Sequence, residues 1–254
     1  MFLSVIIPAY NEEKNLKNKV LDEVWGYLKN QKYFWEVLIV DDGSTDKTVR
    51  LVEEFIRKGR SGIRLLKEKH RGKGGTVIAG MLQAKGDYAL FMDMDQATPI
   101  SEIEKFLPKF EEALPDGRRG YDVVIASRSG REGAPLIRKL MAYGFMLLRT
   151  LILRLPYKDT QCGFKAFKID SAKKIFKRLK IFNESNIISG ASVSAGFDLE
   201  ILYIARKLGL KIAEVNVIWS HKDTERINPI RDSYEGLRDL LKVRINAILG
   251  KYKV

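Results

Sequence analysis

Apolar runs alternate with helix-period segments throughout the first 126 residues of the chain. Each apolar run is short, rich in Val, Ile and Leu, and nearly unbroken, which is typical of strands buried on both faces of a sheet. The predicted strands are residues 3–9, 36–40, 63–67, 88–93 and 122–126, and the predicted helices are residues 12–29, 45–58, 75–85 and 100–113. This order predicts an open, mostly parallel, doubly wound α/β sheet flanked by helices.

The pattern changes after residue 127. The later segments predict helices at residues 136–155, 170–179, 197–208 and 232–249, and a strand at residues 211–219. We expect residues 1–220 to form the main domain and residues 221–254 to form a basic C-terminal helical segment.

The net charge of +13 favours an anionic partner, such as nucleic acid, acidic lipid headgroups or a sugar nucleotide. No helix-turn-helix, zinc-finger or RNP-like signature is present, so we predict no nucleic-acid partner.

One cysteine and two histidines argue against a His/Cys metal site, and the lone cysteine fits a reducing compartment. The N-terminus lacks a basic n-region, so no signal peptide is expected. No uncharged apolar run approaches the ~20 residues that span a bilayer.

Polar motifs follow the first two predicted strands. Tyr10 can lie flat against a base, and Asn11 and Glu12 can hydrogen-bond a base or a ribose, although the same residues suit a plain turn into a helix. After the second strand, Asp41 and Asp42 can bind ribose hydroxyls or a uracil edge. Helix capping accounts for most of that second motif, but not for two adjacent acids.

Two further motifs complete the series. His70-Arg71-Gly72-Lys73-Gly74-Gly75 precedes a helix, and basic, glycine-rich loops at helix N-termini bind anions. Its spacing is not that of a P-loop, and a solvated basic turn is the alternative. Asp93 and Asp95 end the fourth strand, where two carboxylates can hold a divalent cation and, through it, a diphosphate. Ligands gather outside the carboxyl ends of the strands in such sheets.

The chain resembles family 2 glycosyltransferases of the GT-A fold, a Rossmann-like fold that binds nucleotide sugars. The motifs that carry this resemblance are Pro8-Ala9-Tyr10-Asn11-Glu12, Asp41-Asp42-Gly43-Ser44-Thr45-Asp46, Gly72-Lys73-Gly74 and Asp93-Met94-Asp95. Three later runs resemble the polyprenyl-phosphate sugar synthases, in particular the dolichyl-phosphate β-glucosyltransferases. They are Ser127-Arg128, Asp159-Thr160-Gln161-Cys162-Gly163-Phe164-Lys165 and Phe197-Asp198-Leu199-Glu200.

The resemblance implies an inverting transfer of glucose from UDP-glucose to dolichyl (polyprenyl) phosphate, with Mg²⁺ or Mn²⁺ on Asp95 and Asp93. The implied nucleotide-sugar residues are Pro8, Tyr10, Asn11, Glu12, Asp41, Asp42, Lys73 and Asp93. Arg128 would add positive charge near the phosphates, and Asp159 and Asp198 would position the sugar or the acceptor. Arg138, His221 and Arg226 are candidates for the acceptor phosphate, and His70 and Cys162 are interpreted as structural.

Alternatives remain open on the donor and the acceptor. The mannose synthases carry a Gln where Ala97 stands here, which favours glucose, but GDP-mannose and a saccharide acceptor are retained. A non-catalytic nucleotide-sugar or membrane-binding module is a further alternative. Residues 136–155 predict an apolar helix flanked by Arg and Lys, which suits a membrane interface, a buried core or a homodimer contact. We expect a cytoplasmic protein bound peripherally to the membrane's cytoplasmic face.

Overall fold

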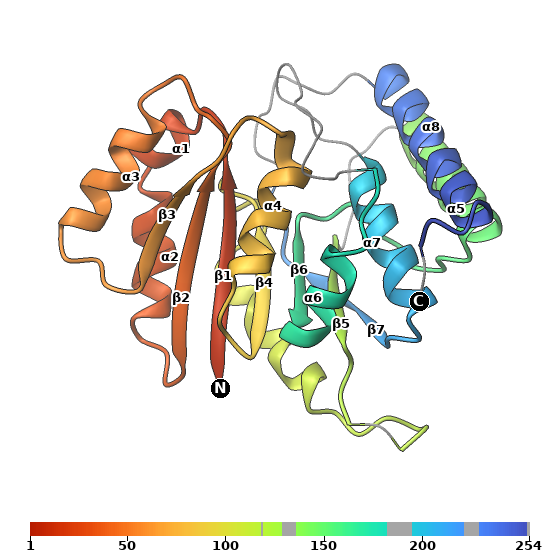
Figure 1. The fold of residues 1–254 in the computed structure, drawn as a ribbon, viewed down its shortest axis with the longest axis horizontal. Helices are drawn as coiled ribbons and strands as arrows, with labels where there is room; N and C mark the ends of the chain where they lie inside the picture. The colour runs from red at the N-terminus through yellow and green to blue at the C-terminus, as the bar shows by residue number, and fades with distance from the viewer. Residues whose placement is uncertain (118, 129–135, 182–194, 221–228, 253–254) are drawn as a thin grey trace.

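The computed structural model describes residues 1–117, 119–128, 136–181, 195–220 and 229–252, with only the backbone described for residues 136–142, 195 and 229–233. One seven-stranded sheet forms the centre, with the strand order β3-β2-β1-β4-β6-β5-β7 (Figure 1). The strands are β1 Phe2–Ala9, β2 Phe34–Asp41, β3 Ile63–Lys67, β4 Tyr88–Met92, β5 Val123–Arg128, β6 Phe164–Lys168 and β7 Ile212–Val217.

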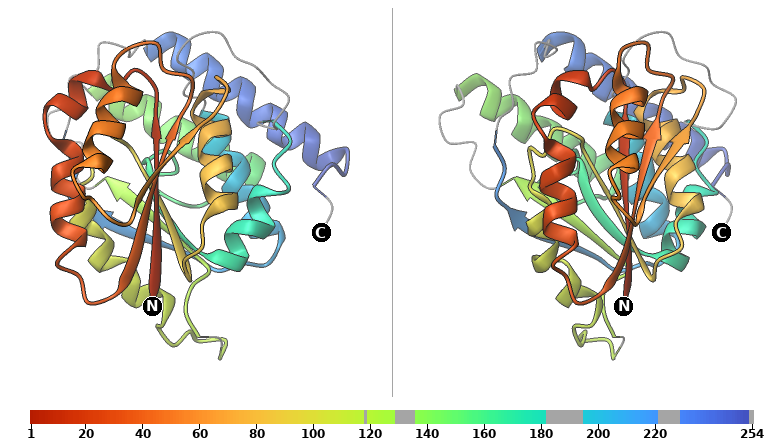
Figure 2. Two further views of the ribbon diagram at one scale, coloured as in Figure 1. Left: turned by 60° about the vertical axis from the view of Figure 1, so that its left-hand side comes forward. Right: turned by 90° about the vertical axis from the view of Figure 1, so that its left-hand side faces the viewer.

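Helices cover both faces of this sheet (Figure 2). They are α1 Glu13–Lys17, α2 Val20–Leu28, α3 Thr48–Arg57, α4 Gly72–Gln83, α5 Leu136–Leu153, α6 Ile169–Phe176, α7 Ala195–Lys207 and α8 Pro229–Ile248, with 3₁₀ helices η1 Ile100–Lys105 and η2 Leu107–Phe110. Side chains alternate along β1: Val5 and Ile7 enter the core under α2, α3 and η1, whereas Ile6 enters the core under α4, α6 and α7. The predicted α/β architecture is confirmed.

The sheet is mixed because of β6. The parallel pairs are β1–β2, β1–β4, β2–β3 and β5–β7, whereas β6 runs antiparallel to β4 and to β5. Met92 at the end of β4 lies opposite Phe164 at the start of β6. The turn before β6 therefore lies at the same sheet edge as the carboxyl ends of the other strands.

Two predicted helices differ from the structure, and one strand was not predicted. The predicted helix at residues 12–29 is two helices, because Asn18 ends α1 and Lys19 adopts a left-handed conformation with φ of 61°. The predicted helix at residues 100–113 is two 3₁₀ helices, because Pro108 cannot donate a helical hydrogen bond. Strand β6 was not predicted, since Lys165 and Lys168 interrupt its apolar pattern.

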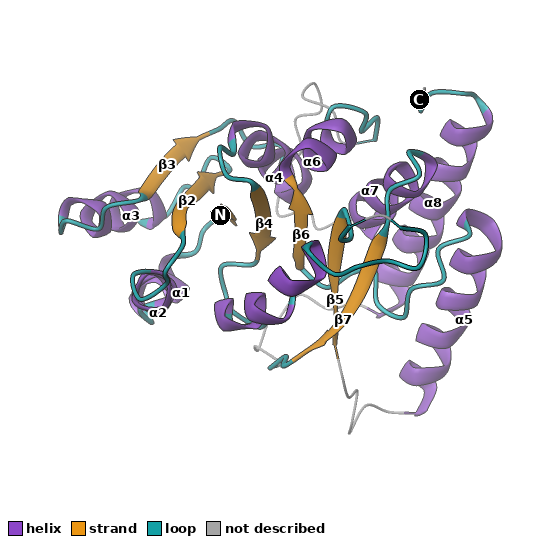
Figure 3. Cartoon of the chain, turned by 90° about the horizontal axis from the view of Figure 1, so that it is seen from below, coloured by secondary structure: helices purple, strands orange, loops and turns teal. Residues whose placement is uncertain are grey.

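Helices α5 and α8 pack side by side on the flank opposite α3 (Figures 1 and 3). Leu240 and Val243 of α8 are buried in the core cluster that also contains residues of α7, so α8 packs against the rest of the chain through its middle turns. Among the helices that the structure describes, none combines the length and the apolar character that crossing a bilayer requires.

Candidate active site

The predicted polar motifs meet at one edge of the sheet. From β1 the chain passes to β2 and β3 on one side, and then crosses to β4 on the other side of β1. In open α/β sheets such a switch between neighbouring strands opens a crevice beyond their carboxyl ends. Tyr10 follows β1, Asp42 follows β2, Asp93 follows β4, and Arg128 ends β5, so all four lie at this edge.

The loops after β1 and β2 are tied to one another by side-chain hydrogen bonds. The Asn11 carboxamide oxygen accepts from the Thr45 backbone N–H at 2.9 Å, and the Ser44 hydroxyl accepts from the Asn11 N–H at 3.0 Å. The Asp41 carboxylate accepts from the backbone N–H of both Gly43 and Ser44 at 3.1 Å. These bonds hold Asn11 in a left-handed conformation with φ of 54° and fix the shape of the loop pair.

Pro8 and Glu12 also belong to this loop pair. Pro8 lies opposite Val40 in the register of β1 and β2. The Glu12 N–H donates to the Thr48 hydroxyl at 2.7 Å, and its carboxylate accepts from the Asn15 amide at 2.5 Å. Both predicted residues thus lie near the crevice, and their contact with a nucleotide stays a prediction.

Asp42 connects the loop to α4. Its carboxylate accepts from the Arg71 N–H at 2.8 Å and lies 2.9 Å from the His70 Nδ1. The His70 ring stacks on Tyr10 with centroids 4.3 Å apart, which fixes the orientation of the tyrosine. Asp41 and Asp42 therefore have partners within the protein, and a ligand is not needed to explain two adjacent buried acids. His70 was predicted to have a structural role, and its contacts with Tyr10 and Asp42 agree with that interpretation.

Asp93 forms an ion pair with Lys73 from the first turn of α4. Burial alone would lower the pKa of Lys73, but the charges of Asp93, Asp198 and Asp95 outweigh burial and raise it. Lys73 is therefore a permanent cation at the crevice. Gly163 lies directly against Asp93, because a Cβ atom placed on this glycine would lie 2.0 Å from the Asp93 Oδ2.

The segment after Asp93 turns one side chain inward. The Asp95 carboxylate accepts from the Ala97 N–H at 2.9 Å. Gln96, with φ of 53°, is buried and accepts from the Ile100 N–H at 3.0 Å. Ser220, the last described residue before 229, donates to the Ala97 carbonyl at 2.8 Å. Hydrogen bonds to Ala97 therefore hold the turn that contains Asp95. The Gln96 side chain is buried and does not face the crevice.

Arg128 and Asp159 form a bidentate ion pair at the end of β5. The Arg128 Nε lies 2.5 Å from Asp159 Oδ2, and its second guanidinium nitrogen lies 2.9 Å from Oδ1. Burial raises the pKa of Asp159, but its hydrogen bonds and the charge of Arg128 outweigh burial and hold that pKa below its usual range. The Arg128 guanidinium also lies over the Trp219 ring, 5.6 Å from its centroid. The structure therefore fixes Arg128 in one orientation.

Lys165 also lies at this edge of the sheet, and no role was predicted for it from the sequence. Its side chain is 0% exposed, and its Nζ lies 2.6 Å from the Asp198 carboxylate and 2.5 Å from the Cys162 carbonyl. A buried lysine requires such partners, because an uncompensated buried charge is costly. The signal available in the sequence was Lys165 within an otherwise apolar run. Asp198, on the first turn of α7, is thereby brought to the crevice.

The remaining predicted residues cannot be placed in the site. His221 and Arg226 lie outside the described residues, and only the backbone of Arg138 is described, in the first turn of α5. Cys162 is buried and free, and burial raises the pKa of its thiol, which fits the structural role predicted for it.

Asp93 and Asp95 fit a metal ion that arrives with its substrate. Among the residues that the structure describes, no group of three or more Asp, Glu, His or Cys side chains is placed to hold a metal ion. Magnesium commonly takes one or two protein carboxylates and completes its coordination with substrate phosphates and water. Two strand-end carboxylates satisfy that need, but they do not form a stand-alone metal cage.

Comparison with known proteins agrees with this geometry. Residues 4–176 match the model of glycosyl transferase family 2. A dolichyl-phosphate beta-glucosyltransferase from Dictyostelium discoideum is 37% identical, over 100% of this chain and 77% of its own length. The Homo sapiens protein of the same name is 32% identical, over 99% of this chain and 78% of its own length.

Two solved structures share the fold. Mannosyl-3-phosphoglycerate synthase from Rubrobacter xylanophilus has a TM-score of 0.65 at 17% identity, over 100% of this chain and 76% of its own. Glucosyl-3-phosphoglycerate synthase from Mycobacterium tuberculosis, in complex with Mn²⁺, UDP and phosphoglyceric acid, has a TM-score of 0.60 at 22% identity, over 96% of this chain and 78% of its own. These likenesses confirm the predicted GT-A fold. The chain belongs to glycosyltransferase family 2.

Proposed function

We propose that this glycosyltransferase moves glucose from UDP-glucose to dolichyl (polyprenyl) phosphate at a membrane surface. The observation that carries the proposal is the contact between Gly163 and Asp93. This contact brings together two motifs in a single site. One is the run from Asp159 to Lys165, which resembles the lipid-phosphate branch, and the other is the Asp93–Asp95 motif proposed for the diphosphate. The 37% identity to a dolichyl-phosphate beta-glucosyltransferase over the full chain supports the same acceptor and sugar.

The donor would lie across the crevice between β1 and β4. The tied loops after β1 and β2 offer Tyr10, stacked on His70, as a platform for the base. Lys73, which pairs with Asp93, and Arg128, which pairs with Asp159 at the end of β5, supply fixed positive charge at this edge of the sheet. A Mg²⁺ or Mn²⁺ ion held by these two aspartates would neutralise charge on the departing diphosphate.

The nucleophile is an oxygen of the acceptor phosphate. Its second pKa is about 6, so at neutral pH it is already an anion and needs no strong base. Attack at the anomeric carbon forms the new C–O bond as the bond to UDP breaks, and UDP leaves with the electron pair, which inverts the centre. Asp159 is engaged by Arg128 through both carboxylate oxygens, which favours a positioning role over proton abstraction.

The proposed membrane contact is the α5–α8 face. We define this face as the exposed apolar side chains Tyr143, Leu147, Leu148, Leu151, Tyr234, Leu237, Leu241, Ile245 and Ile248. An exposed apolar surface of this extent marks a contact site, and Arg and Lys beside it favour an anionic membrane over a second, equally basic copy. The stripe from Tyr234 to Ile248 runs for roughly 21 Å along α8. A peripheral position on the cytoplasmic face agrees with the free, buried Cys162.

A donor screen tests the proposal. The protein is incubated with dolichyl phosphate in vesicles, Mn²⁺ or Mg²⁺, and UDP-glucose or GDP-mannose, and the lipid product is identified by mass spectrometry. We expect a glucosyl lipid from UDP-glucose, and no product after chelation of the metal. Asp95→Asn should abolish transfer. Asp22→Asn on α2, which alters a partly exposed ion pair with Arg60, should not.

Each other outcome selects an alternative. A mannosyl lipid from GDP-mannose would replace the proposed donor. Transfer to a saccharide with none to the lipid would replace the proposed acceptor. Failure of every donor to release a nucleoside diphosphate would leave only a nucleotide-sugar or membrane-binding module.

A further inference from the structure

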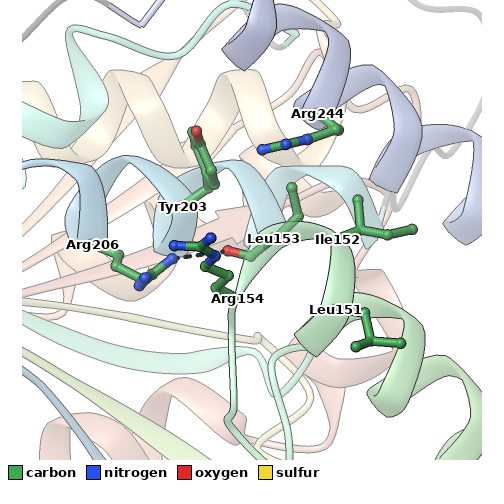
Figure 4. Close-up of a pocket in the computed structure, with 7 residues that line it drawn as sticks. All are labelled: Leu151, Ile152, Leu153, Arg154, Tyr203, Arg206 and Arg244. Atoms are coloured by element: carbon green, nitrogen blue, oxygen red, sulfur yellow. Dashed lines mark hydrogen bonds between the residues drawn. The ribbon is translucent and has the colours of Figure 1, made fainter.

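A second basic site lies away from the crevice. A cavity of ≈ 340 Å³ opens between the end of α5, the last turns of α7 and the outer part of α8 (Figure 4). Its lining includes Arg154, Arg206, Arg244, Leu151, Ile152 and Tyr203. On α7, Arg206 comes eight residues after Asp198, or about 12 Å further along the helix axis. The cavity is therefore separate from the candidate active site.

Three arginines from different parts of the chain line this cavity. Arg154 directly follows α5 in a left-handed conformation with φ of 55°, Arg206 donates to the Leu153 carbonyl at 3.3 Å, and Arg244 projects from α8. Within the described part of the chain, none of the three forms an ion pair with a carboxylate. Three like charges around one cavity repel one another, so an anion in that cavity would be stabilised by all three.

The cavity borders the α5–α8 face. Leu151, which is 69% exposed, belongs to that face and also lines the cavity. The cavity surface itself is polar, and the apolar α5–α8 face adjoins it at Leu151. Guanidinium groups bind phosphate oxygens in a bidentate manner, and apolar helix faces accept acyl chains.

We propose that this arginine cavity binds the phosphate headgroup of an anionic membrane phospholipid, and so anchors the α5–α8 face to the bilayer. The proposal rests on the membrane contact in the proposed function, but not on the identity of the donor or of the acceptor. Each arginine near an anionic surface is expected to contribute about fivefold to membrane affinity, and three together about a hundredfold.

Vesicle binding tests the site without donor or dolichyl phosphate. Co-sedimentation is measured with vesicles of phosphatidylcholine alone and of phosphatidylcholine with phosphatidylglycerol. The test variant carries Arg154→Gln, Arg206→Gln and Arg244→Gln. The control carries Arg50→Gln, Arg57→Gln and Arg119→Gln, which remove the same charge elsewhere on the molecule.

We expect the cavity variant to lose about a hundredfold in affinity for the phosphatidylglycerol vesicles, and the control to stay within about threefold of the parent. Equal losses in both variants would show that net charge alone attracts the protein, and would overturn the site. Because Arg206 also bonds to Leu153, the double variant Arg154→Gln/Arg244→Gln provides a second test that leaves this bond intact.

Free phosphate is the other source of the same chemistry. Inorganic phosphate is titrated against the thermal unfolding of the parent and of the cavity variant at constant ionic strength. Stabilisation that depends on the arginines, together with vesicle binding that does not, would assign the cavity to a soluble phosphate and refute the lipid site. Transfer to a detergent-dispersed polyprenyl phosphate should persist in the cavity variant, so failure of the lipid site and failure of the proposed function are distinguishable.

Discussion

Gly163→Ala should lower activity by about a hundredfold while leaving the fold nearly intact. The added Cβ would lie 2.0 Å from the Asp93 Oδ2, 2.5 Å from its Cγ and 2.8 Å from its Oδ1. Ordinary contacts begin near 3.4 Å, so the nearest carboxylate oxygen must retreat by roughly 1.4 Å. That displacement takes Asp93 away from Lys73 and from the place proposed for the metal ion and diphosphate.

The expected magnitudes separate catalysis from stability. Misplacement of a catalytic group by about 1 Å costs on the order of a hundredfold in rate, so kcat/KM should fall by about that factor. Overpacking usually costs ~1–3 kcal/mol in the free energy of unfolding. We expect the lower end, about 1 kcal/mol, because the Asp93 side chain is 38% exposed and can turn toward solvent.

The assay compares initial rates of glucosyl transfer with urea unfolding of the same preparations. Gly26→Ala is the matched control, because a Cβ there meets nothing within 4 Å and alanine in α2 should stabilise by up to ~1 kcal/mol. Gly163→Ala combined with Asp93→Ala should be no slower than Asp93→Ala alone. A folded Gly163→Ala protein within threefold of parental kcat/KM would refute the reasoning, as would losses that multiply in the double variant.

Two further predictions concern the buried charges beside the crevice. Lys165→Met should lower the free energy of unfolding by ~3–5 kcal/mol, because it leaves the Asp198 carboxylate without its partner, and adding Asp198→Asn should restore part of that loss. Urea titration measures both, and a loss below ~1 kcal/mol would contradict the pairing. The pKa of Asp159 is lower in the folded protein than in the unfolded chain, where it is ~3.9. Ionised Asp159 therefore stabilises the fold fully at pH values above ~3.9, and this stabilisation is lost as the pH falls through the folded-state pKa. Asp159→Asn should therefore flatten the stability–pH profile below about pH 4, and an unchanged slope there would count against the Arg128 pair.

The layered α/β fold could be predicted because its signal is local. Residues such as Val37, Leu38 and Ile39 form an apolar run that only a strand buried on both faces accommodates. The order of strands and helices then restricts the sheet to a few topologies. Strand β6 escaped prediction because Lys165 looks like a surface residue until Asp198, 33 positions away, supplies its partner.

The positions of site residues that follow strand ends could be predicted from the sequence. The contacts by which one site residue orients another could not. The positions of Tyr10, Asp42, Asp93 and Arg128 follow from strands that end at one edge. His70 supports Tyr10, 60 positions away, and engages Asp42, 28 positions away, and both contacts are between different loops. No local pattern encodes such a contact, because it forms only after the sheet has brought the loops together.

The sequence by itself determined the alternation of elements, the acidic and basic motifs at the strand ends, and the apolar character of α5. These follow from periodicity and from residue chemistry, which act over a few positions. Only the tertiary structure decided that Gly163 packs on Asp93 and that Arg128 is held by Asp159. It also decided that three arginines, one just after α5 and one each on α7 and α8, surround one cavity. These are contacts between residues far apart in the sequence, and the packing of the sheet and its helices decides which of these contacts form.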